Sequence, residues 1–240
     1  MGTDLTETYA ALWQAARTAF LRGDLQLDPL LRDRAENQSA PDARRGLTVI
    51  FRPQPAVAAQ VAGWLAELAT CAPDQTFYAP GQLHVTVLSL FTATPEYAPY
   101  FARLPRYLAA LDAALGSLPP FAVAFHGVTA SPAAVMVQGF PADGTLESAR
   151  AALRAALTQA GLGGDLDRRY RLTTAHLSAL RLRAPLADPA RFVAQLDAAR
   201  SRDFGVTQVD ELLLVANDWY MTPGVVEVVR RYPLTSTQPV

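Results

Sequence analysis

The order of predicted elements repeats once along the chain, and this repeat limits the possible fold more than any other feature. β-Branched, apolar runs at 47–51 and 83–91 flank a helical pattern at 55–70. The same strand–helix–strand order returns at 134–139, 145–161 and 171–182. Two copies of one unit predict an α+β protein of two lobes, in which two antiparallel sheets face a central groove and carry helices on the outside.

The third element of each unit carries the same polar pair inside an otherwise apolar strand. The first reads "LHVTVLSL" and contains His84 and Thr86, and the second reads "AHLSALRL" and contains His176 and Ser178. Alternate residues of a strand share a face and lie about 6–7 Å apart, so each histidine accompanies its hydroxyl on the face opposite the packed residues. If the two lobes face each other, the four groups converge across one groove.

Two imidazoles and two hydroxyls in one groove suit in-line displacement at phosphorus. A neutral imidazole takes a proton from the attacking water or hydroxyl, and a protonated imidazole gives one to the departing oxygen. Imidazole titrates near pH 6.5, so both forms are accessible at neutral pH. Each general acid or base contributes about 10²–10⁴-fold, and the hydroxyls donate to the non-bridging oxygens. This chemistry predicts no metal and no cofactor.

Other patterns argue against competing chemistries. His126 has no hydroxyl residue two positions later and stands beside Gly127, so we interpret it as structural. The sequence contains no H-E-x-x-H, P-loop or G-x-G-x-x-G pattern, and the single Cys71 allows no disulfide within the chain. The formal net charge of −1 gives no overall basic field for general nucleic-acid binding.

The ends of the chain differ in pattern from its middle. Apolar residues at helical spacing over 4–22 predict a helix, and we assign 1–45 as an N-terminal helical extension, 46–234 as the main domain and 235–240 as a flexible tail. The sequence has no apolar run long enough to cross a bilayer, and its first residues lack a signal-peptide core. We therefore expect a cytoplasmic monomer that does not associate with membranes.

The two motifs resemble those of the two-histidine (2H) phosphoesterase superfamily, which includes RNA 2',3'-cyclic phosphodiesterases and bacterial 2'-5' RNA ligase-like proteins. The resemblance spans 46–234 and includes the hairpin "ELLLVANDWYMTPGVVEVVRRYPL". It implies that His84 and His176 form the acid–base pair, with Thr86 and Ser178 as phosphate ligands. Serine in the second motif replaces the more usual threonine, which keeps the hydroxyl but loses a methyl group that restricts the rotamer.

The resemblance also suggests residues that bind the substrate. Arg181 occupies the place of an arginine that members often carry at the end of this strand, although strict alternation points its side chain away from His176. Trp219 or Tyr220, near the hairpin turn, either stacks on a base or packs in the interior. The run "RRYR" at 168–171 either guides an RNA end or forms a solvated turn.

By this resemblance the protein opens 2',3'-cyclic or related phosphodiesters of nucleotides or RNA ends, which would be its substrate partners. For hydrolysis to a 2'-phosphate, the resemblance assigns His84 to protonation of the 3' oxygen and His176 to activation of water. Two alternatives stay open at this point. One is an RNA- or nucleotide-binding module without turnover, and the other is 2'-5' RNA ligation, which uses the same residues.

Overall fold

One antiparallel sheet of nine strands runs through the residues that the computed structural model describes, which are 4–31, 42–168 and 171–235. The strands are β1 (Arg45–Phe51), β2 (Thr76–Phe77), β3 (Val85–Thr94), β4 (Phe121–Ser131), β5 (Ala134–Pro141), β6 (Leu177–Arg181), β7 (Asp203–Val209), β8 (Glu211–Asn217) and β9 (Glu227–Pro233). Their order across the sheet is β7-β4-β5-β6-β3-β1-β8-β9, with β2 paired to β6.

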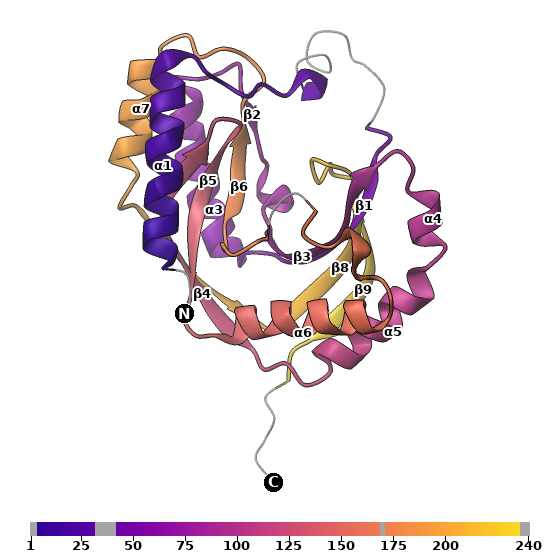
Figure 1. The fold of residues 1–240 in the computed structure, drawn as a ribbon. Helices are drawn as coiled ribbons and strands as arrows, with labels where there is room; N and C mark the ends of the chain where they lie inside the picture. Colours follow the sequence, from indigo (N-terminus) through magenta and orange to yellow (C-terminus); the bar gives the residue numbers. More distant parts are fainter. Residues whose placement is uncertain (1–3, 32–41, 169–170, 236–240) are drawn as a thin grey trace.

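The sheet has two four-stranded halves, β7-β4-β5-β6 and β3-β1-β8-β9. Among the described residues, the halves join through one pair, Val85 of β3 with Leu177 of β6. The chain returns from the first half to the second at Asp210, between β7 and β8. The predicted α+β fold of two lobes is confirmed, and its two predicted sheets are the halves of one strongly curled sheet (Figure 1).

The helices lie outside the curled sheet (Figure 1). They are α1 (Leu5–Arg22), α3 (Pro55–Ala69), α4 (Ala98–Phe101), α5 (Leu104–Leu115), α6 (Thr145–Gln159) and α7 (Pro189–Ala198), with the 3₁₀ turns η1 (Pro80–Gln82) and η2 (Gly163–Asp165). Asp4 caps α1 by accepting the Thr6 amide, and Gly23 ends it at φ 77°. Pro105 is the second residue of α5, in the first turn, where a helix tolerates a proline because the backbone amides there have no partner within the helix.

The helix of each strand–helix–strand unit packs on the half of the sheet that does not contain the strand before it. Helix α3, which follows β1, packs on β7, and the Gln54 amide before it donates to Thr207 Oγ1 at 3.1 Å. Helix α6, which follows β5, packs instead on β3. In Figure 1, α3 accordingly lies with α1 and α7, while α6 lies beside α5. The crossing chains tie the two lobes together, which fixes the groove between them.

Most buried apolar residues lie between the helices and the outer face of the sheet, as one continuous core. A smaller cluster occupies the inner face of β1 and β8, and its members are Ile50, Leu213, Val215 and Met221. Polar residues such as Thr48, Thr86 and Ser178 also lie on the inner face, where they line a groove. No helix among the described residues is both long enough and apolar enough to cross a membrane.

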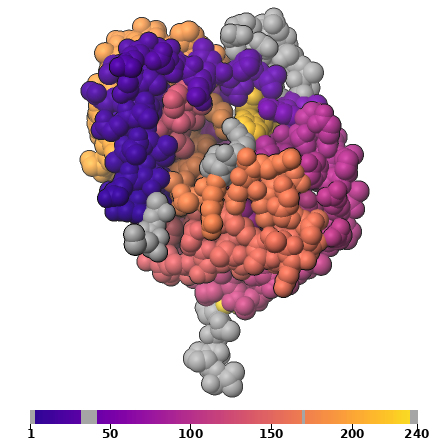
Figure 2. Space-filling model, viewed as in Figure 1, coloured from indigo at the N-terminus to yellow at the C-terminus, as the bar shows by residue number. Residues whose placement is uncertain are grey.

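The N-terminal residues pack on the first half of the sheet and then reach the second. Helix α1 lies against β4 and α7, where Figure 2 shows it in indigo on the outside of the molecule. Beyond it, the Asp28 amide donates to Leu182 O at 3.0 Å, and Asp28 Oδ1 accepts from the Tyr220 hydroxyl at 2.8 Å. Residues 24–31 therefore connect β6 with the β8–β9 loop. The domain boundary at 45 stays a prediction, and 236–240 of the predicted tail lie outside the described residues.

Candidate active site

The two predicted histidines lie where the halves of the sheet join. His84 directly precedes β3, and His176 directly precedes β6, so each stands next to one member of the Val85–Leu177 pair. The sequence pattern predicts both histidines inside strands. The predicted strands 83–91 and 171–182 begin instead at Val85 and Leu177, the residues that pair between the two halves.

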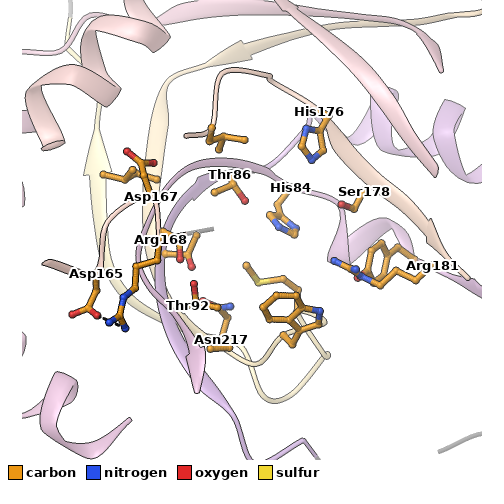
Figure 3. Close-up of a pocket in the computed structure, with 18 residues that line it drawn as sticks. His84, Thr86, Thr92, Asp165, Asp167, Arg168, His176, Ser178, Arg181 and Asn217 are labelled. Carbon is orange, nitrogen blue, oxygen red and sulfur yellow. Dashed lines mark hydrogen bonds and ion pairs between the residues drawn. The ribbon is translucent and has the colours of Figure 1, made fainter. Parts of the chain in front are cut away.

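The structure brings the two motifs together side by side. The Val85–Leu177 pair brings His84 and Thr86, which flank Val85, close to His176 and Ser178, which flank Leu177. Both motifs therefore lie beside the join between the halves of the sheet. All four side chains line the same groove, and Figure 3 shows them around its centre.

Residues from both halves of the sheet form the walls of this groove. Arg181 lies on the side of Ser178, while Asp165, Asp167 and Arg168 lie on the opposite side (Figure 3). The other lining residues are Thr48, Tyr78, Leu88, Ser89, Thr92, Ala93, Leu172, Asn217, Trp219 and Met221. Thr48 and Ser89 interrupt apolar strands just as Thr86 does, a signal that sequence reasoning overlooked. The wall at 165–168 comes from a loop whose path no local pattern predicts.

Each imidazole is held through its Nδ1 atom by a different kind of partner. His84 Nδ1 lies 2.8 Å from the carbonyl oxygen of Gln82, and His176 Nδ1 lies 2.8 Å from Thr174 Oγ1. A carbonyl oxygen only accepts, so His84 Nδ1 carries a proton and donates it, while a hydroxyl serves as either donor or acceptor. The Nε2 atom of His84 is therefore the nitrogen that exchanges protons.

Burial keeps both imidazoles neutral at pH 7. It lowers the pKa of His84 to about 4, a shift opposed by the Gln82 carbonyl and supported by the charges of Arg52 and Arg181. Burial also lowers the pKa of His176 to about 4, with further lowering from His84, Arg150 and Arg181. An anion bound between the rings would act in the opposite direction, because it stabilises the protonated form.

Arg181 reaches the groove because of a β-bulge. The register of β5 with β6 shifts between the pairs Met136–Ser178 and Val135–Leu180, so Ala179 is an extra residue in β6. The bulge reverses the alternation, and Arg181 lines the groove on the same side as Ser178. The expectation that Arg181 points away from His176, which assumed strict alternation along the strand, is therefore wrong.

The structure separates the two aromatic candidates at the hairpin. Trp219 lines the groove, with the guanidinium carbons of Arg44 and Arg181 at 5.2 and 5.8 Å from its ring centre. Tyr220 is 3% exposed, does not line the groove, and directs its hydroxyl to Asp28. Trp219 therefore stays a candidate for contact with a base. Tyr220 instead has a structural role in the loop, because its ring is buried and its hydroxyl is bonded to Asp28.

The remaining sequence candidates lie away from the centre of the groove. His126 is exposed on β4, and its ring stacks on Phe140 with 4.1 Å between the ring centres. Of the "RRYR" run, Arg168 lines the groove and pairs with Asp165 at 2.9 Å, whereas 169–170 lie outside the described residues. Within the described parts of the chain, no three His, Cys, Asp or Glu side chains cluster as a metal site would require.

A family model describing the 2'-5' RNA ligase superfamily matches residues 53–218, which is more than half of the chain. The chain belongs to this superfamily. The resemblance to 2H phosphoesterases drawn from the two motifs is thereby confirmed, and with it membership in a group of phosphoesterase and ligase enzymes. No curated protein matches the chain.

Solved structures of other proteins share the fold of this chain. The protein TT0787 of Thermus thermophilus is 22% identical with a TM-score of 0.59, over 81% of this chain and 100% of that chain. Escherichia coli LigT complexed with 3'-AMP is 15% identical with a TM-score of 0.54, over 80% of this chain and 99% of its own. LigT complexed with ATP is 16% identical with a TM-score of 0.52 and the same coverage. At these identities the likeness establishes the fold.

Proposed function

We propose that the protein is a metal-independent phosphoesterase that opens 2',3'-cyclic phosphodiesters of nucleotides or RNA ends by general acid–base catalysis. The observation that carries the proposal is that both histidines and both hydroxyls line one groove, beside the Val85–Leu177 pair that joins the halves of the sheet. A phosphorus atom held between the two motifs has a proton acceptor on one flank and a proton donor on the other. This is the arrangement that in-line displacement needs.

The Nδ1 partners support the assignment of His84 as acid and His176 as base. The Gln82 carbonyl accepts a hydrogen bond from His84 Nδ1–H, and this bond is stronger when the ring is protonated. It therefore raises the pKa of His84 and stabilises its protonated form. Thr174 leaves His176 free to stay neutral, with Nδ1–H donated to its hydroxyl and Nε2 open to accept. An anionic substrate bound beside His84 would raise the pKa of His84 and so favour its protonated form.

The proposed step balances as a simple hydrolysis. Water attacks phosphorus and gives a proton to His176 Nε2, while the bond from phosphorus to the 3' oxygen breaks. His84 gives its proton to that 3' oxygen, and the product is a 2'-phosphate with a free 3' hydroxyl. Thr86, Ser178 and Arg181 would donate to the non-bridging oxygens, where negative charge gathers in the transition state.

The substrate class follows from the groove and from the superfamily. Trp219 offers an aromatic surface beside Arg181, at the edge of the proposed phosphate site, and bases stack on such surfaces. LigT, which shares the fold, has been crystallised with 3'-AMP, ATP and NADP+. Nucleotides carrying a cyclic phosphate, alone or at an RNA end, are therefore the substrates we propose.

A turnover assay with EDTA present tests the proposal. Purified protein is incubated with 2',3'-cyclic AMP, and the products are separated by chromatography; we expect 2'-AMP and a bell-shaped dependence of rate on pH. His84→Ala and His176→Ala should each lower kcat/KM by about 10²–10⁴-fold. His126→Ala is the matched control, because this third imidazole lies outside the groove, and it should retain full activity.

The two alternatives give different results in the same assay. A binding module would hold the nucleotide, detected by calorimetry, without forming a product from any cyclic or 2'-5' substrate. A ligase would join an RNA with a 2',3'-cyclic end to an RNA with a 5' hydroxyl, giving a longer strand on a gel. Either result in place of 2'-AMP would overturn the hydrolase assignment.

A further inference from the structure

A buried arginine stands behind the groove and bonds to both motifs. Arg150 belongs to the apolar stripe of α6 that contains Leu146, Leu153 and Leu157, and it is 1% exposed. Its Nε donates to Val87 O at 3.0 Å, and its Nη2 donates to Thr86 O at 3.0 Å and to Thr174 O at 2.7 Å. Arg150 does not line the groove itself.

The guanidinium occupies the place where the sheet comes apart. Past the Val85–Leu177 pair, β3 and the segment before His176 have no further ladder pair in the described structure. In that gap the carbonyl groups of Thr86 and Thr174 both accept hydrogen bonds from the Arg150 guanidinium. In a continued ladder they would accept from backbone amides of the neighbouring strand. The side chain therefore replaces the missing ladder and holds the two chains apart at a fixed separation.

The residues bonded to Arg150 are the ones that orient the reacting groups. Thr174 is also the Nδ1 partner of His176, and Thr86 is a proposed phosphate ligand. We infer that Arg150 is a positioning residue that sets the separation and alignment of the two His-x-(Thr/Ser) motifs, an inference that rests on the proposed function. Arginine suits this task because its planar fork donates in several fixed directions at once, which an ammonium group does not.

The charge of Arg150 contributes a second effect. The charged and titratable groups that act on His176 are His84 before β3, Arg150 on α6 and Arg181 on β6, and all three lower its pKa. Glu147, one turn earlier on α6, lies 3.5 Å from Arg150 Nη1 but is largely exposed. Arg150 thus helps to keep the proposed base neutral without touching it.

Two substitutions separate the bonding role from the charge. Arg150→Met removes both, while Arg150→Lys keeps the positive charge but loses the fork that spans the two chains. Arg200→Met is the matched control: Arg200 also donates to a strand carbonyl, Val128 O at 2.6 Å, but on the outer side of the sheet. Thermal unfolding of each variant establishes a temperature at which all of them are folded.

Turnover of 2',3'-cyclic AMP gives the first readout. We expect kcat to fall by about 10–100-fold in both Arg150 variants with KM nearly unchanged, because misplacement of a reacting group by about 1 Å costs up to about 10²-fold. Arg200→Met should keep the wild-type kcat. A wild-type kcat in Arg150→Lys, or an equal loss in Arg200→Met, would overturn the positioning role.

Proton NMR of the histidine rings gives a second readout that needs no turnover. The ring signals are assigned with the three His→Ala variants and followed against pH. The midpoint of His176 should move upward in Arg150→Met and stay near the wild-type value in Arg150→Lys. If the wild-type protein hydrolyses no cyclic phosphate, the proposed function fails, whereas an unmoved midpoint in Arg150→Met would refute the inference about Arg150.

Discussion

Replacing Gly139 with alanine should displace the segment that carries His176. Gly139 on β5 lies against the peptide of Ala175, and a Cβ added there would stand 1.8 Å from Ala175 O. The carbonyl has to retreat by about 1.2 Å before the contact reaches 3.0 Å, the shortest distance that real Cβ atoms keep. Phe125 Cε1, at 3.0 Å from the same Cβ, blocks relief on that side.

The displacement also breaks a set of hydrogen bonds around Tyr9. The Tyr9 hydroxyl donates to Gly139 O at 3.1 Å and accepts from the Ala175 amide at 3.1 Å. Overpacking of this kind costs about 1–3 kcal/mol, and for a chain of this size each kcal/mol lowers the melting temperature by about 2–4 °C. A shift of about 1 Å at His176 should reduce kcat by up to about 10²-fold.

Thermal unfolding and kcat on 2',3'-cyclic AMP measure both effects. Gly63→Ala in the middle of α3 is the control, because its Cβ meets nothing within 4 Å. That substitution should stabilise the protein by about 0.5–1 kcal/mol and leave kcat unchanged. A Gly139→Ala protein with wild-type melting temperature and wild-type kcat would refute the close packing of β5 on the His176 segment.

Three further outcomes follow from the site. The pKa values of His84 and His176 are lowered to about 4, below the unfolded value of about 6.5, so the unfolded chain takes up protons first. Stability is therefore full above pH 6.5 and falls by about 1–3 kcal/mol per histidine toward pH 4; urea unfolding at pH 4.5 and 7 with equal stability would contradict this. Arg181→Ala should raise KM by about 10–100-fold, because a charged donor to phosphate contributes about 1.5–3 kcal/mol. Trp219→Ala should raise KM for 2',3'-cyclic AMP but not for ribose 2',3'-cyclic phosphate, which has no base; equal effects on both would exclude stacking.

The convergence of the two motifs was predictable from the sequence because it depends on local rules. Alternation along a strand puts His84 with Thr86 and His176 with Ser178, and the repeat of the whole unit sets the two strands in equivalent places. The structure joins these strands at Val85 and Leu177. Their roles in catalysis stay a prediction, and periodicity predicts a shared groove only on the further condition that the two lobes face each other.

Other features depend on contacts between distant segments. The bulge at Ala179 reverses the face of Arg181, and it arises from the register of β6 against β5. The exchange of α3 and α6 between the halves is a property of the crossover connections. Tyr220 and Trp219 are neighbours in the sequence, but the hydroxyl of Tyr220 is bonded to Asp28, which lies far away in the sequence.

One missed residue did leave a signal in the sequence. Arg150 interrupts the apolar stripe of a helix between Leu146 and Leu153, where a charged side chain needs buried partners. The pattern indicates that such partners exist but not which carbonyl groups they are. The partners are the carbonyl groups of both motif strands, and they become evident only when β3 and the His176 segment are seen to diverge.

The shared role of the two imidazoles is tested most directly by kcat/KM on 2',3'-cyclic AMP for His84→Ala, His176→Ala and the double variant, all in EDTA. Each single variant should lose about 10²–10⁴-fold. The double variant should lose little more than the less active single variant, because both proton transfers belong to one transition state. Losses that multiply in the double variant, or a single variant with wild-type kcat/KM, would contradict an acid and a base acting on one phosphorus atom.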